Sequence, residues 1–189
     1  MNKFLISMAL VLAAFVGTAS AQTSVSGSYD AGLLNNSNTV LTEYRADLTQ
    51  TVGNFAFSVG GIGLTNNTVE QNGSALEASV GYTLPTVLTV ETTVTAGVGH
   101  RFFNGATGYY YYVGQVNARK WLTDNVAVVA GYRYRDGMKI ADPIRDSRGQ
   151  VGLQFNMGEK LSTSVLYTHT QYANNVIANG ALVNVAVAL

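Results

Sequence analysis

In the stretch Leu88–Leu122, LTVETTVTAGVGHRFFNGATGYYYYVGQVNARKWL, apolar and polar residues alternate. The mostly apolar face consists of Leu88, Val90, Thr92, Val94, Ala96, Val98, His100, Phe102, Tyr110, Tyr112, Gly114, Val116 and Ala118. The mostly polar face consists of Thr89, Glu91, Thr93, Thr95, Gly97, Gly99, Arg101, Val113, Gln115, Asn117 and Arg119. A period of two predicts two β-strands joined at Asn104-Gly105, each longer than the roughly five to six residues usual in globular sheets. The fold then depends on which face points inward.

The same alternation recurs along the chain and predicts ten strands. They cover residues 23–33, 41–52, 54–64, 75–84, 87–103, 109–122, 126–137, 147–157, 160–172 and 180–189. The third, FAFSVGGIGL, is too rich in glycine and apolar residues to be oriented, and dividing the third and fourth differently would leave eight strands. Longer and tighter connections alternate, as in outer-membrane barrels with short periplasmic turns and longer outer loops. An even strand number places both termini in the periplasm.

The N-terminus has the features of a secretory signal peptide. Met1-Asn2-Lys3 is a short basic segment, residues 4–16 are mostly apolar, and Ala19-Ser20-Ala21 matches an A-x-A cleavage site. The apolar run is too short for a membrane-spanning helix. We therefore expect residues 1–21 to be cleaved and residues 22–189 to form one domain.

The composition excludes several classes of function. Lys and Arg number 11 and Asp and Glu number 11, which argues against a nucleic-acid partner because phosphate binding requires a basic excess. There is no cysteine, so disulfides and cysteine-based metal or redox sites are excluded. Charged residues make up 12%, against about 25% in an average soluble domain. A closed, hydrogen-bonded barrel would stabilise such a chain without disulfides.

The aromatic residues indicate which face points outward. On the apolar faces they gather near the strand ends, with small or aliphatic residues between. The loop-end group is Tyr44, Phe102, Tyr110, Tyr112, Tyr132, Tyr134 and Tyr167, and the turn-end group is Phe55, Phe57, Tyr82 and Phe155. Two such girdles place amphipathic rings at the headgroup levels of a bilayer, whereas a soluble core would hold its largest rings at its centre. We therefore predict an all-β fold, a transmembrane antiparallel up-and-down β-barrel, rather than a soluble barrel or sandwich.

Over its whole mature length the chain resembles the small bacterial outer-membrane β-barrel proteins. The signal peptide, the girdled strands and the alternating connections agree with that family. The final segment 181–189, ALVNVAVAL, is similar to the terminal strand that the barrel-assembly machinery reads, with Leu189 in place of the usual final aromatic residue. The resemblance implies an integral protein of the outer membrane in a Gram-negative-type envelope. Its implied partners are the lipid bilayer, lipopolysaccharide and the assembly machinery.

With the apolar face toward lipid, the polar face lines the lumen and carries charges of both signs. The predicted lumen charge network comprises Asp30, Glu43, Arg45, Asp47, Glu77, Glu91, Arg101, Arg119, Arg133, Arg135 and Arg148. In the hairpin, pairs whose numbers sum to 210 keep polar residues opposite one another and set Glu91 against Arg119. A one-residue slip would destroy this agreement. We therefore predict a Glu91–Arg119 contact.

Three roles fit such a lumen. Mutual salt bridges would close it, since small barrels are usually filled by side chains and open channels belong to roughly 16–18-stranded ones. A narrow porin-like channel for small solutes would instead use the charges to select what passes. A lipid-modifying enzyme needs a nucleophile, a base and an orienting acid, but His100 and His169 fall on the lipid-facing side and no metal or cofactor site is expected. We expect a structural or surface role, with the channel as the alternative and the enzyme least favoured.

Overall fold

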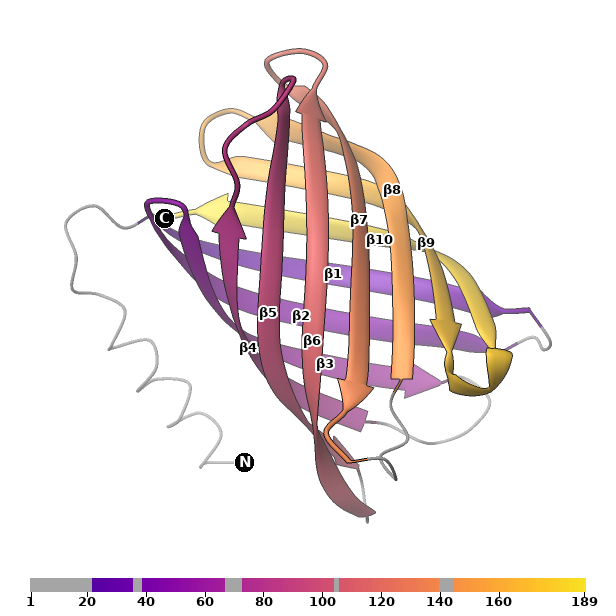
Figure 1. Cartoon of the computed structure of the whole chain (residues 1–189). Coiled ribbons are helices and arrows are strands. Elements are labelled where there is room, and N and C mark those ends of the chain that lie inside the picture. The colour runs from indigo at the N-terminus through magenta and orange to yellow at the C-terminus, as the bar shows by residue number, and fades with distance from the viewer. Residues whose placement is uncertain (1–21, 36–38, 67–72, 104–105, 140–144) are drawn as a thin grey trace.

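The computed structural model describes residues 22–35, 39–66, 73–103, 106–139 and 145–189, which form a β-barrel (Figure 1). The strands are β1 (Gln22–Leu34), β2 (Val40–Val52), β3 (Phe55–Asn66), β4 (Gly73–Thr83), β5 (Val90–Phe103), β6 (Ala106–Trp121), β7 (Val126–Gly137), β8 (Arg145–Met157), β9 (Leu161–Tyr172) and β10 (Ile177–Ala188). A single 3₁₀ turn, η1 (Ala173–Asn175), precedes β10. In this part of the chain no helix is long and apolar enough to cross a membrane. The predicted signal peptide, residues 1–21, and the Asn104-Gly105 turn lie outside the described residues.

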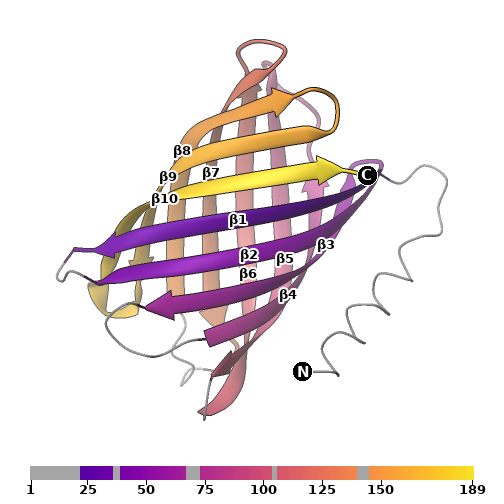
Figure 2. The ribbon, with the colours of Figure 1, turned by 180° about the vertical axis from the view of Figure 1, so that it is seen from behind.

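The sheet is closed on itself. Each strand pairs antiparallel with its neighbours in the sequence, and β10 pairs with β1 through eleven residue pairs from Ser24–Ala188 to Leu34–Ala178. Figure 2 shows this seam, where the yellow β10 lies beside the indigo β1. The prediction of an all-β, antiparallel, up-and-down barrel of ten strands is confirmed, and eight strands are not found. We call the end with the β1–β2 and β7–β8 connections the loop end, and the opposite end the turn end.

The connection between β4 and β5 differs from the prediction. The strand expected to begin at residue 87 begins at Val90, because Leu88 (φ 50°) and Thr89 (φ 64°) form a two-residue turn. Val87 and Val90 exchange backbone hydrogen bonds of 3.2 and 2.9 Å around it. Positive φ at both central residues matches the twist of the flanking strands but is usually supplied by Asn-Gly. The assignment of Leu88 and Thr89 to the two faces of a strand was therefore wrong.

Other boundaries move by a few residues. β6 begins at Ala106 and β10 at Ile177, each three residues earlier than predicted, and β8 begins at Arg145 rather than residue 147. The predicted register of the β5–β6 hairpin is the observed one, with Glu91 opposite Arg119. It holds as far as Arg101, after which the register shifts at a bulge.

The apolar face of the strands points away from the lumen. Nine of the eleven residues predicted for the girdles are 36–61% exposed on the outside: Tyr44, Phe55, Phe57, Tyr82, Phe102, Tyr110, Tyr112, Tyr132 and Tyr167. The other two, Tyr134 and Phe155, are half-buried. The Phe55 and Tyr82 rings lie 4.9 Å apart at the turn end. β3, which the sequence left unoriented, turns Phe55 and Phe57 outward and Ile62, 3% exposed, inward.

Candidate functional site

The charged residues of the lumen fall into three groups. The crossing cluster consists of Asp30, Glu43, Arg133, Arg135, Asp146 and Arg148, all buried. The lateral cluster consists of Arg45, Asp47, Glu77 and Tyr111, and the turn-end pair is Glu91 with Arg119. Arg101, the remaining residue of the predicted network, donates from Nη1 to the Tyr109 hydroxyl at 3.3 Å. The predicted residues of these three groups form ion pairs with one another or with Asp146.

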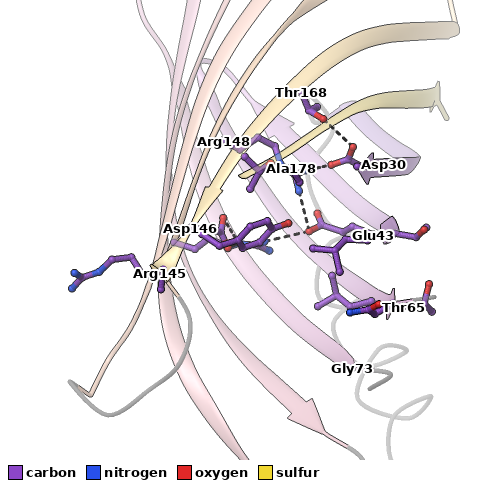
Figure 3. Close-up of a pocket in the computed structure, with 18 of the residues that line it drawn as sticks. Asp30, Glu43, Thr65, Gly73, Arg145, Asp146, Arg148, Thr168 and Ala178 are labelled. Carbon is purple, nitrogen blue, oxygen red and sulfur yellow. Dashed lines mark hydrogen bonds and ion pairs between the residues drawn. The ribbon is translucent and has the colours of Figure 1, made fainter. Parts of the chain in front are cut away.

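Glu43 is the centre of the crossing cluster. Its Oε1 accepts from Nη1 of Arg133 at 3.1 Å, and its Oε2 accepts from Nη2 of Arg135 at 3.2 Å and from Nη2 of Arg148 at 3.4 Å. Glu43 belongs to β2, and the first two arginines belong to β7, which lies opposite β2 in the ring of ten strands. The contacts of Glu43 therefore span the lumen from wall to wall (Figure 3).

Two further carboxylates complete the crossing cluster. Arg148 pairs with Asp30 at 2.7 Å, and Arg135 donates from Nε to Oδ2 of Asp146 at 3.0 Å. Hydroxyl groups of β9 add to both sides: Thr168 donates to Asp30 at 3.1 Å, and Thr170 accepts from Nε of Arg148 at 3.1 Å. Three arginines face three carboxylates, so the cluster is neutral as a whole. Buried ions need this degree of pairing to offset their desolvation.

Asp146 is not in the predicted network, because the predicted strands 126–137 and 147–157 leave it in the connection between them. In the structure it lies in β8, is 2% exposed and opposes Arg135 across the β7–β8 ladder. The signal was present, since Asp146 lies two residues before Arg148 and therefore on the same face of an extended strand.

The lateral cluster joins β2, β4 and β6. Arg45 contacts Asp47 and Glu77, each at 2.7 Å, and the Tyr111 hydroxyl donates to Oε2 of Glu77 at 3.2 Å. Tyr111, 1% exposed, is among the largest fully buried side chains. It packs with Ile62 and Tyr109 in a small apolar group inside the lumen. The predicted faces include Tyr110 and Tyr112 of the run 109–112 but omit Tyr109 and Tyr111. The alternation of side chains along the strand would have placed these two on the lumen side.

The turn-end pair has the predicted contact. Nε of Arg119 donates to Oε2 of Glu91 at 3.1 Å, and Nη2 of Arg119 contacts the same oxygen. Trp121, which the sequence reasoning missed, donates from its indole to Oε1 of Glu91 at 3.2 Å and lies under the Arg119 guanidinium, 5.1 Å from the ring centre. The side chains of Arg119 and Glu91 remain 38% and 32% exposed. This pair joins adjacent strands and leaves the opposite wall untouched.

Cavities lie at both ends of the lumen. The loop-end cavity has a volume of about 270 Å³ and is lined by Arg101, Arg135 and Asp146, among others. The turn-end cavity has a volume of about 460 Å³ and is lined largely by hydroxyl and amide side chains such as Thr95 and Gln115. Glu43 and Arg148 line both cavities, so the crossing cluster lies between them.

The two histidines lie on the outer wall, as parity predicted. The His100 ring lies 4.4 Å from the rings of Phe102 and Tyr110. His169 shares a hydrogen bond of 2.8 Å between Nδ1 and Oδ1 of Asn179, which also accepts from the Tyr167 hydroxyl at 2.7 Å. Within the described ranges no three His, Asp or Glu side chains gather in a way that could hold a metal ion.

No protein-family model matches the sequence, and no curated protein matches it. Solved structures do share its fold. An outer membrane channel from Pseudomonas putida F1 superposes with a TM-score of 0.56 at 8% identity, covering 89% of this chain and 95% of the other. The beta domain of the Bordetella autotransporter Brka gives 0.54 at 7% identity, covering 89% and 99%. The translocator domain of the autotransporter NalP from Neisseria meningitidis gives 0.50 at 11% identity, covering 98% and 95%. The fold is therefore that of the outer-membrane β-barrels.

Proposed function

We propose that residues 22–189, after removal of residues 1–21, form an integral outer-membrane barrel with a structural or surface role and a lumen closed by the crossing cluster. The observation that carries this proposal is the position of Glu43, whose carboxylate from β2 meets guanidinium groups from β7 and β8 at 3.1–3.4 Å. Because these contacts span the lumen, they occupy the path that a solute would need.

The charge balance of the crossing cluster supports closure. Channels select ions with rings of one sign of charge. Here every carboxylate of the cluster lies within 4.0 Å of at least one arginine. Separating one partner would leave a buried ion without compensation, which is strongly unfavourable. The cluster therefore favours a closed lumen over a passage that opens by thermal motion.

The barrel's placement in the envelope belongs to the same proposal. The turns between β2 and β3 and between β8 and β9 would face the periplasm, together with both termini, and the loop end would face outward. The bilayer and lipopolysaccharide would surround the outer wall, and β10 would carry the signal for the assembly machinery. This topology is supported by the closed, even-stranded fold and by the outward aromatic rings.

A narrow diffusion channel for small solutes is the alternative. It is favoured by one observation, the presence of cavities of about 270 and 460 Å³ on the two sides of the crossing cluster. A path through the barrel would then require only that this cluster separate. The Pseudomonas putida protein of the same fold is described as an outer membrane channel.

Conductance in planar bilayers separates the two. We expect the wild-type barrel to give no discrete openings. The double variant Glu43→Ala/Arg133→Ala removes the central carboxylate of the crossing cluster and one of its arginines without changing net charge, and it should give them. The matched control Glu91→Ala/Arg119→Ala removes a pair that joins adjacent strands and should remain silent. Discrete, charge-selective openings of the wild type that are altered by Arg133→Ala would instead establish the channel.

We propose no enzymatic activity. Nucleophilic catalysis needs a base close to a nucleophile and an orienting acid. His100 lies among aromatic rings and His169 bonds to an amide, both on the outer wall. A lipid-hydrolysis activity that disappears in His169→Ala would contradict this part of the proposal.

A further inference from the structure

A groove lies on the outer wall at the rim of the loop end, and it shares Arg145, Tyr172 and Ala173 with the loop-end cavity. Residues of β7, β8, β9 and η1 line it, and its volume is about 460 Å³. They are Tyr132, Tyr134, Arg145, Ser147, Gln171, Tyr172, Ala173 and Asn175. We call it the rim groove. Tyr132 is 54% exposed on the outside of the barrel, and Arg145 points away from the crossing cluster in Figure 3.

The level of the rim groove is marked by aromatic side chains. Tyr132 and Tyr134 line it, and Tyr112 lies beside it with its ring 6.4 Å from that of Tyr134. Tyrosines on the outside of a membrane barrel sit at the headgroup level. In a bilayer, the material that fills a groove at this level is therefore a lipid headgroup.

The lining indicates which headgroup fits. The hydroxyls of Tyr132 and Ser147 can donate hydrogen bonds to a ligand, as can the amides of Gln171 and Asn175. Arg145 supplies a guanidinium group. No carboxylate is among the described residues that line the groove. The neighbouring Asp136 carboxylate is already bound by Arg145, Tyr134 and Tyr112, so it offers little counter-charge to an ammonium group. This combination suits a phosphate group attached to a sugar, since a guanidinium binds phosphate oxygens through parallel N–H bonds.

Asp136 holds the Arg145 guanidinium in position. Asp136 accepts from its Nε at 3.1 Å and lies 3.1 Å from its Nη2, while the hydroxyls of Tyr134 and Tyr112 donate to the same carboxylate at 2.9 and 3.3 Å. The Arg145 side chain is nevertheless 67% exposed. A guanidinium has five N–H donors, so contacts through Nε and Nη2 leave donors for a second anion.

We propose that the rim groove binds the phosphorylated sugar headgroup of an outer-leaflet glycolipid, with Arg145 contacting the phosphate. The assignment to the outer leaflet rests on the proposed function, which turns the loop end outward. The binding itself does not depend on whether the lumen conducts, so a conducting wild type would overturn the closed lumen and leave this site intact.

The test measures lipid binding to the folded full chain in detergent by native mass spectrometry, with bis-phosphorylated lipid A and phosphatidylglycerol as probes. We expect one lipid A per barrel and a ten- to hundredfold loss of affinity in Arg145→Ala, the effect of one charge-assisted contact. Lys120→Ala is the matched control, because it removes an exposed cation at the turn end and should bind as the wild type does.

Gel mobility of unboiled samples shows whether each variant is folded. Equal binding of lipid A by the wild type and Arg145→Ala would overturn the site. If phosphatidylglycerol binds as tightly as lipid A and depends equally on Arg145, the glycolipid assignment is overturned.

Discussion

The Glu43 carboxylate forms ion pairs with three arginines of the lumen, Arg133, Arg135 and Arg148. Replacing it by glutamine keeps the shape and removes the charge. Arg148 would retain Asp30, and Arg135 and Arg133 would retain Asp146 at 3.0 and 4.0 Å, but the crossing contact would lose its anion. Replacing Glu43 by glutamine should therefore lower the stability of the folded barrel.

We expect Glu43→Gln to lower the free energy of unfolding by about 3–5 kcal/mol, the range for removing one partner of a buried ion pair. Guanidinium-induced unfolding in detergent measures it. Glu91→Gln is the control, because the Glu91–Arg119 pair is about one-third exposed and the same change should cost about 1 kcal/mol or less. Equal losses of unfolding free energy in the two variants would contradict the argument that the buried crossing cluster stabilises the barrel more than the exposed Glu91–Arg119 pair does.

At the scale of the strand, β5 and β6 show how a glycine can be matched to a large side chain. Gly99 of β5 directly opposes Tyr111 of β6, and a methyl group on Gly99 would lie 2.2 Å from Cζ of the Tyr111 ring. That ring is buried and bonded to Glu77, so it cannot move aside freely. The glycine is therefore required by the close approach of its neighbour.

Gly99→Ala should destabilise the barrel by about 1–3 kcal/mol through overpacking. Gly114→Ala in β6 is the matched control, since a methyl group there meets nothing within 4 Å on the outer wall. It should leave stability unchanged or raise it slightly. Unfolding midpoints of the two variants check this, and a larger loss in Gly114→Ala would contradict the packing described for Tyr111.

The β4–β5 turn is a second feature at this scale. Leu88 and Thr89 both have positive φ, a conformation that costs roughly 1–2 kcal/mol per residue when a side chain is present. Replacing the pair by Asn-Gly should therefore raise the free energy of unfolding by about 1–2 kcal/mol. Gly53, with φ of 57° in the β2–β3 turn, offers the opposite case. Gly53→Ala should lower stability, and a gain there would contradict the argument.

Particular residues show how much of the structure can be predicted from the sequence. Parity alone identified the inward side of the charged strands and the Glu91–Arg119 contact, because neighbours in a hairpin are fixed by local register. The alternation did not predict that Glu43 contacts Arg133, since contacts across a barrel depend on closure and strand tilt. It also did not predict the orientation of β3. That orientation follows from pairing, in which Phe55 opposes Tyr82.

For the whole molecule, closure of the sheet removes every edge strand that could pair or fray. We expect unboiled protein to migrate ahead of boiled protein in a detergent gel, because a sheet in which every strand is paired on both sides resists detergent. A variant lacking residues 177–189 would leave β1 and β9 as edges and should show no fast band. Identical mobility of boiled and unboiled wild type would contradict a closed barrel.

The crossing cluster also has a consequence for kinetics. Its contacts join residues far apart in the sequence, 138 positions between Asp30 and Thr168 and 105 between Glu43 and Arg148. Such contacts need the walls that carry them to have come together, so we expect them to form late in folding, after the rate-limiting step. Changes at contacts of this kind speed unfolding and leave the folding rate nearly unaltered. The lumen charges would thus set how long an assembled barrel persists, while the hairpins set how quickly it is made.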